Sequence, residues 1–294
     1  MPYILKEQVV IFMYRECLFE YNGINSNQYN LMLVYESSAF GSVSTGAEYE
    51  AVTDALPKAS DHLLYGLKYA DKPLSFGIEI LSLDNEIPID KIDEVKEWLF
   101  GQDGYKRFVT IDERRNYYLN AILIPDEDII DIQGLRGFRC TLQNASGFWY
   151  KDEEVSFDNL LAVHSINVKT VKDFFVFPNI EIKLKPFSKA MKNDAFHLTM
   201  LGSNGTIYLS DTMTDNNVTY NINTKFGTCS SSTGANISII PPLNFSPPLK
   251  MVNGVNVINF SAYWINEQDE KESIVPYIES LTYRYKTLHR LGGF

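Results

Sequence analysis

The chain has 294 residues, of which 45% are hydrophobic and 13% aromatic, and its formal net charge is -11. This apolar content excludes a disordered chain, and the length favours two domains over one. The acidic excess and the scattered Lys and Arg residues argue against specific nucleic-acid binding. Tyr and Phe number 18 each, beside 17 Gly and 12 Pro, and this favours a mainly β protein with little helix.

The first apolar run, Val9–Tyr14, is only six residues long. It is too short for the core of a signal peptide or for a membrane span, so we expect a strand and no membrane insertion. Gly41–Ala47 follows as a flexible polar loop, and Tyr49–Leu67 shows no sustained period, which is typical of an arm outside the core. Leu74–Ile80 then alternates apolar with small or polar residues, which predicts a strand with one solvent-exposed face.

One helix is predicted in the middle of the first half. Ile92, Val95, Trp98 and Leu99 recur at helical spacing, and Asp90 precedes them where free backbone amides attract carboxylates. Gly101 and the stretch that follows it end the pattern. The sequence therefore predicts a helix that ends at Gly101.

A β-hairpin is predicted directly after this helix. Phe108–Ile111 and Tyr117–Leu123 are typical of strands, and the polar stretch Asp112–Asn116 is typical of the turn between them. Ile129–Ile132 and Arg136–Leu142 are predicted as further strands. An exposed hairpin beside a helix suits a protein that builds assemblies.

A change from apolar to charged residues at Trp149–Glu154 places a domain boundary near residue 150, which gives domains 1–150 and 151–294, with a last strand able to return to the first. The second region has regularly spaced short strands with Gly, Asn and Pro turns, which favours a β-sandwich or jelly roll. Pro241–Pro248 is too stiff for a central strand and is expected to be a surface loop. The expected strands are Phe174–Phe177, Ile180–Leu184, Ala195–Met200, Thr206–Leu209, Val218–Ile222, Val255–Ser261 and Leu281–Tyr285.

Three cysteines, Cys17, Cys140 and Cys229, lie far apart, and their odd number cannot complete a disulfide framework. No metal-ligand spacing occurs. Cys140 lies in an alternating strand opposite Arg139 and Thr141, so we expect a buried thiol, and synthesis in a reducing cytoplasm.

The residue pattern predicts no active site, no cofactor and no metal. The four histidines, His62, His164, His197 and His289, are isolated from one another and from cysteine. Glu79, Asp112 and Glu113 are the carboxylates to test first for glycosidase chemistry, but the last two lie in a predicted turn, where charge serves solvation.

Two glycine-rich stretches, Gly202–Gly205 and Gly227–Gly234, lack the Lys-Ser/Thr of a phosphate loop and are predicted to be β-turns. A jelly roll can stack sugars on exposed aromatic rings, and the candidates are Tyr208, Tyr263 and Trp264. Packing in the core of a sandwich is the alternative role for these three rings.

Several short motifs, taken in order, resemble one family. They are Phe19–Ser26 with Tyr29, the helix that ends in Trp98 and Leu99, the strand pair Tyr105–Leu123, and the closing Gly254–Asn256 and Leu291–Phe294. Together they resemble the distal tail proteins (Dit) of long-tailed phages. In that family the opening motif starts almost at the initiator Met, whereas sixteen residues precede Cys17 here. Either Met13 is the start, or residues 1–16 form an added strand.

The resemblance implies an N-terminal β-sandwich with a helix and a hairpin, and a C-terminal galectin-like sandwich. It implies a structural virion protein without an active site, assembled in the host cytoplasm, which forms a hexameric ring at the tail tip. The ring would join the tail tube protein to the tail-associated lysin and anchor receptor-binding or baseplate proteins. The candidate ring contacts are Phe108, Ile111, Tyr117, Tyr118 and Leu119.

Two alternatives belong to other classes. A carbohydrate-binding or receptor-binding tail component would show saturable binding to cell-wall polysaccharide. An enzyme such as a glycosidase would show turnover that is lost when one carboxylate is changed.

Overall fold

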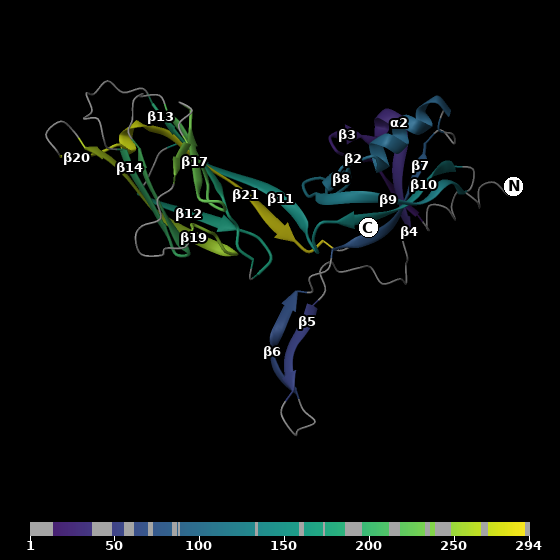
Figure 1. Ribbon diagram of the computed structural model, residues 1–294, viewed down its shortest axis with the longest axis horizontal. Coiled ribbons are helices and arrows are strands. Elements are labelled where there is room, and N and C mark those ends of the chain that lie inside the picture. The colour runs from purple at the N-terminus through teal and green to yellow at the C-terminus, as the bar shows by residue number, and fades with distance from the viewer. Residues whose placement is uncertain are drawn as a thin grey trace. The chain divides into compact units, whose positions relative to one another are not determined.

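The computed structural model describes residues 14–36, 49–55, 62–69, 73–83, 87, 89–132, 135–158, 162–172, 174–185, 196–211, 218–232, 236–238, 248–265 and 270–291. Over these ranges the chain forms antiparallel sheets and one α-helix (Figure 1), so the predicted mainly β class is confirmed. The chain divides into two units. The first extends to Lys151 and resumes at His289, and the second is Asp152–Leu288.

The first unit is built on an eight-stranded sheet with the order β1-β4-β7-β10-β9-β8-β2-β3. The tight turn between β2 and β3 uses Asn22 and Gly23, both with positive φ, as a two-residue hairpin turn requires. The strands are β1 (Tyr14–Cys17), β2 (Phe19–Tyr21), β3 (Ile24–Asn25), β4 (Leu31–Glu36), β7 (Ser75–Ser82), β8 (Lys106–Thr110), β9 (Leu119–Ile132) and β10 (Leu135–Asn144), and a 3-10 turn covers Ser26–Tyr29.

The helix α2 (Ile89–Phe100) confirms the predicted helix and its end before Gly101. Val95, Trp98 and Leu99 are its buried residues, and they pack into the core of the first unit. The Trp98 ring stacks on Phe19 at 5.8 Å and on Tyr29 at 5.1 Å between ring centres, and its Nε1 donates to the Tyr21 carbonyl oxygen at 3.0 Å. Trp98 therefore joins the helix to β2 by both packing and a hydrogen bond.

The predicted hairpin is formed by β8 and β9, which pair in antiparallel register with Phe108 opposite Leu119. Its second strand extends past the predicted end at Leu123 and includes the separately predicted strand Ile129–Ile132. Pro125 lies beside register shifts in the β9–β10 pairing, where a missing backbone N–H is tolerated.

The turn after β8 is organised by Asp112. Its Oδ1 accepts hydrogen bonds from the Thr110 hydroxyl and from the Arg114 backbone N–H, each at 2.8 Å. The Asp112 carbonyl oxygen accepts from the Arg115 N–H at 3.1 Å. This carboxylate, one of the glycosidase candidates, therefore holds a turn together.

The segment predicted to be an aperiodic arm forms a separate two-stranded sheet of β5 (Tyr49–Ala55) and β6 (His62–Tyr69). The register shifts between Val52 and Thr53, which pair with Gly66 and Leu64, so Tyr65 is an extra residue that breaks the alternation along β6. The loop Gly41–Ala47 lies outside the described residues.

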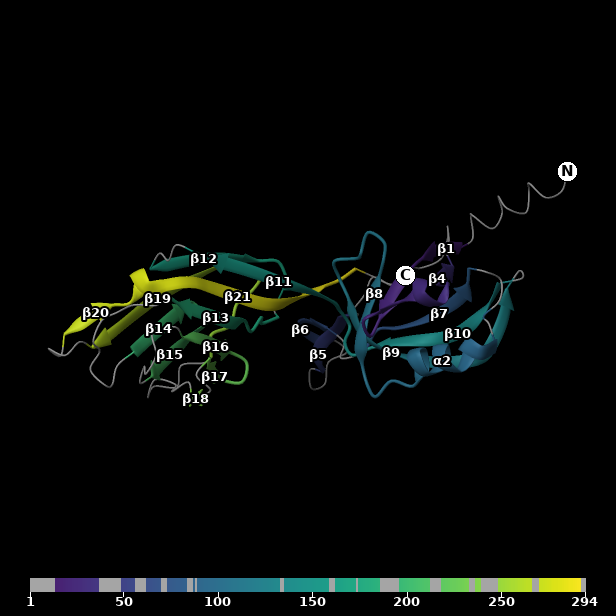
Figure 2. The same ribbon diagram turned by 90° about the horizontal axis from the view of Figure 1, so that it is seen from above.

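The second unit holds two sheets that face each other across one core. Figure 2 shows β21 extending along the length of this unit. One sheet has the order β11-β21-β13-β16-β17-β18, and the other has the order β12-β19-β14-β15, with β20 paired to β19. The strands are β11 (Trp149–Phe157), β12 (Val163–Val168), β13 (Asn179–Leu184), β14 (Phe196–Gly202), β15 (Gly205–Asp211), β16 (Thr219–Asn223), β17 (Thr228–Ser231), β18 (Asn236–Ser238), β19 (Gly254–Ile265), β20 (Lys271–Ser273) and β21 (Ile278–His289), and a 3-10 turn covers Val275–Tyr277.

Most strands predicted in the second region are present, but Phe174–Phe177 is not a strand. Only Val176 pairs there, in an isolated bridge with Met251, and Pro178 follows before β13 begins. The proline lacks the N–H that a continued ladder needs. Of the predicted loop Pro241–Pro248, residues 241–247 lie outside the described part of the chain.

Replacing Trp98 by Ala should lower the free energy of unfolding by about 3–5 kcal/mol, because a large buried ring is removed. Chemical denaturation of the purified protein measures this loss. Trp98→Phe is the matched control: it keeps an aromatic ring and loses the Nε1 hydrogen bond, so its loss should be smaller. An unchanged midpoint in Trp98→Ala would contradict the packing described for α2.

Replacing Asp112 by Ala should lower the free energy of unfolding by about 1–2 kcal/mol, because two hydrogen bonds to its carboxylate disappear. Asp103→Ala is the control, since Asp103 is exposed and in a nearby loop of the same unit. Thermal or denaturant melting compares the two variants. Equal stabilities would show that the Asp112 carboxylate does not organise the turn.

Candidate functional site

Three of the five residues expected at a ring contact are buried inside the first unit. Phe108 and Leu119 are fully buried, and the Phe108 ring lies 5.4 Å from that of Phe19. Tyr118 stacks on Tyr150 at 5.6 Å between ring centres. These side chains stabilise the fold of their own chain. They cannot contact a neighbouring subunit while the first unit is folded.

The other two candidate residues lie at the surface end of the hairpin. Ile111 is 42% exposed, and Tyr117 is half-buried with its ring edge-on to His289 at 4.9 Å. The Ile111 backbone N–H donates to the Leu18 carbonyl oxygen at 2.8 Å, which fixes the residue beside β2. Of the five candidate residues, Ile111 is therefore the one that is exposed to a partner at this end of the hairpin.

The remaining candidates for chemistry are engaged in structural contacts or isolated from one another. Glu79 pairs with Arg139 across β7 and β10 at 2.8 Å, and the Cys140 thiol is buried, which raises its pKa to about 12. His164 is buried against the Phe157 ring at 4.5 Å between ring centres. The side chain of His62 lies outside the described residues. Within the described ranges, no three His, Cys, Asp or Glu residues group as a metal site.

The three aromatic residues proposed to stack a sugar do not form an open platform. Trp264 is 1% exposed and belongs to the core, so a sugar cannot reach its ring. Tyr263 is packed by His197 at 5.0 Å between ring centres, and Lys271 Nζ lies 4.8 Å from the Tyr263 ring centre. The Tyr208 hydroxyl is 3.1 Å from His197 Nδ1. Tyr208 and Tyr263 are half-buried and engaged with neighbouring side chains, and sugar stacking on these two rings stays a prediction.

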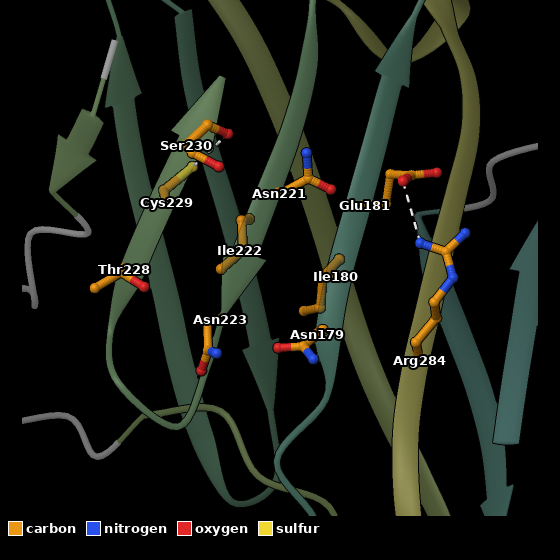
Figure 3. Close-up of a pocket in the computed structure, with 10 residues that line it drawn as sticks. All are labelled: Asn179, Ile180, Glu181, Asn221, Ile222, Asn223, Thr228, Cys229, Ser230 and Arg284. Atoms are coloured by element: carbon orange, nitrogen blue, oxygen red, sulfur yellow. Dashed lines mark hydrogen bonds and ion pairs between the residues drawn. The ribbon is translucent and has the colours of Figure 1, made fainter. Parts of the chain in front are cut away.

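A shallow hollow of about 440 Å³ lies on the other sheet of the second unit (Figure 3). Neighbouring strands β21, β13, β16 and β17 line it. Its polar lining consists of side-chain amides, hydroxyls and one ion pair, from Asn179, Glu181, Asn221, Asn223, Thr228, Ser230 and Arg284. The sequence pattern does not reveal this group because its members lie on strands far apart in the chain.

The charges beside the hollow compensate one another. Arg284 donates to Glu181 through NH1 at 3.1 Å and to Glu154 through Nε at 2.7 Å. These hydrogen bonds, to Glu181 first and to Glu154 second, raise the pKa of the Arg284 guanidinium above its ordinary value. The group stays fully charged, and two carboxylates surround it.

No helix among the described residues is long and apolar enough to cross a membrane. No curated protein matches the chain by sequence.

Comparison with known proteins finds similarity to phage tail proteins. Residues 16–146 match the family model described as "Phage tail protein N-terminal domain". The Dit protein of phage SPP1, described as a hub of the adsorption apparatus, is 12% identical, with a TM-score of 0.60 over 93% of this chain and 100% of that one. A chain of the phage P2 baseplate, 8% identical, reaches a TM-score of only 0.48 over 93% and 98%. The resemblance to distal tail proteins is thus confirmed: residues 16–146 match the model of a phage tail protein N-terminal domain, and the chain shares the fold of SPP1 Dit.

Proposed function

We propose that this protein is a structural component of a phage tail tip, a hub that assembles as a hexameric ring in the virion. The ring would join the tail tube to the tail-tip proteins and anchor adsorption proteins. The observation that carries the proposal is the fold shared with SPP1 Dit over 93% of the chain, with a matching N-terminal domain.

The β5–β6 hairpin supports assembly on physical grounds. Among the described strands it pairs with no other sheet, and Glu50, Ala51, Val52 and Thr53 are all exposed. An isolated two-stranded hairpin is only marginally stable in water. A neighbouring subunit that packs against it would supply the missing burial.

Exposed apolar side chains and open strand edges in the first unit also favour assembly. Tyr105, Ile111, Ile124 and Ile129 are each 42–48% exposed, and β1 and β3 end the eight-stranded sheet. A closed ring covers such surfaces symmetrically in every subunit. We assign the subunit contact to the first unit because the isolated β5–β6 hairpin also belongs to it.

The purified full-length chain should form hexamers at micromolar concentration, because closure of a ring covers the exposed edges of every subunit. Native mass spectrometry measures the particle mass directly. A trimer would favour a receptor-binding protein, and a monomer would favour a binding module or an enzyme. Either result would contradict the ring.

Replacing Ile111 by Glu should weaken the assembly, because it places a charge at an apolar contact. The folded subunit should keep its stability, since Ile111 already contacts water. Val257→Glu is the matched control, because Val257 is 41% exposed and belongs to the second unit. Size-exclusion chromatography with light scattering should show smaller particles for the first variant alone. Unchanged particles in both variants would remove Ile111 from the interface.

A further inference from the structure

We propose that the hollow on the β21-β13-β16-β17 face of the second unit binds a neutral sugar. The proposal goes beyond the structural role above and does not depend on the ring. It rests on the chemistry of the lining residues, on their charges and on the size of the hollow.

The lining offers unused hydrogen-bonding groups. The side chains of Asn179, Asn221, Thr228 and Ser230 make no side-chain hydrogen bond with the described part of the chain, and all four residues are exposed. Amides and hydroxyls both donate and accept hydrogen bonds. A sugar presents hydroxyl groups of the same dual character around its ring, so it can both donate hydrogen bonds to these groups and accept hydrogen bonds from them.

The charge distribution selects a neutral ligand over an anionic one. Arg284 is the cation of the lining, and Glu181 and Glu154 already accept its hydrogen bonds. An added anion would have to displace these carboxylates or approach them closely, at an electrostatic cost. A neutral polyhydroxylated ring avoids this cost.

The hollow is poorly suited to a protein partner. Its apolar residues, Ile180, Ile222 and Cys229, are 1–4% exposed and belong to the core beneath. The centre of a protein interface is usually apolar and depleted of charge, whereas this surface is polar across four strands. Its volume of about 440 Å³ lies within the range of about 300–1,000 Å³ for small-molecule sites.

An aromatic ring lies in the turn at one end of the hollow. Phe226 is 71% exposed in the turn between β16 and β17, and its backbone N–H donates to Asn223 Oδ1 at 3.1 Å. Asn223 and Thr228, on either side of this turn, both line the hollow. Lys225 Nζ lies 5.5 Å from the Phe226 ring centre, so one ring face at most is open for the stacking that sugars require.

The test uses the full chain and three neutral probes: lactose, chitotriose and maltotriose. Saturation-transfer NMR at millimolar sugar, followed by titration, should show binding of at least one of them. Glucuronate serves as the anionic comparator and should bind more weakly. Asn179→Ala and Asn221→Ala should each reduce affinity about two- to tenfold, the range for one lost hydrogen bond.

Asn259→Ala is the matched control, because Asn259 is an exposed asparagine on a strand of the opposite sheet. It should leave the affinity unchanged. Circular dichroism spectra and melting curves check that all variants fold. The proposal is overturned if none of the three neutral sugars binds, if glucuronate binds better than they do, or if Asn179→Ala and Asn221→Ala bind as well as Asn259→Ala.

Discussion

The alternation of side chains along antiparallel strands is the constraint on which the rest of the second unit depends. Because successive residues point to opposite faces, burial of Ile180 and Ile182 in the core fixes Asn179 and Glu181 on the outer face of the same strand. The register of β13 with β16 then places Glu181 opposite Asn221. The polar hollow is thus a direct consequence of how the core is packed.

The sequence could predict the elements whose pattern is local. The helix repeats its apolar residues at a regular spacing, and the hairpin strands flank a polar turn, so both were correctly placed. The length of β9 could not be predicted, since Pro125 and the acidic residues after it imitate a turn. Only the neighbouring strand, with its register shifts, shows how the proline is accommodated.

The candidate site was harder to predict than the fold. Alternation shows that a strand has two faces, but it does not show which face the rest of the chain covers. Phe108 and Leu119 are apolar residues of a hairpin. They belong to the same buried core as Phe19 and the buried residues of α2. In the hollow, Glu181 and Arg284 are about a hundred residues apart, and only the pairing of β13 with β21 brings them together.

Several ion pairs of the described residues join neighbouring strands in both units. Glu79 with Arg139, Lys183 with Glu279, and Arg284 with two carboxylates all lie at the surface. Exposed pairs of this kind contribute little stability individually, but opposite charges on neighbouring strands favour the correct pairing. This arrangement suits a protein that functions through its contact surfaces.

The points where the chain leaves and re-enters the first unit connect its two proposed roles. Tyr150, just before the exit, pairs with Tyr118, and His289, at the return, packs on Tyr117. Both anchors therefore lie at the start of β9, a few residues after Ile111 at the proposed ring contact. The second unit is attached through the chain segments that follow Tyr150 and precede His289. The two proposed roles would therefore be linked through these two segments of the chain.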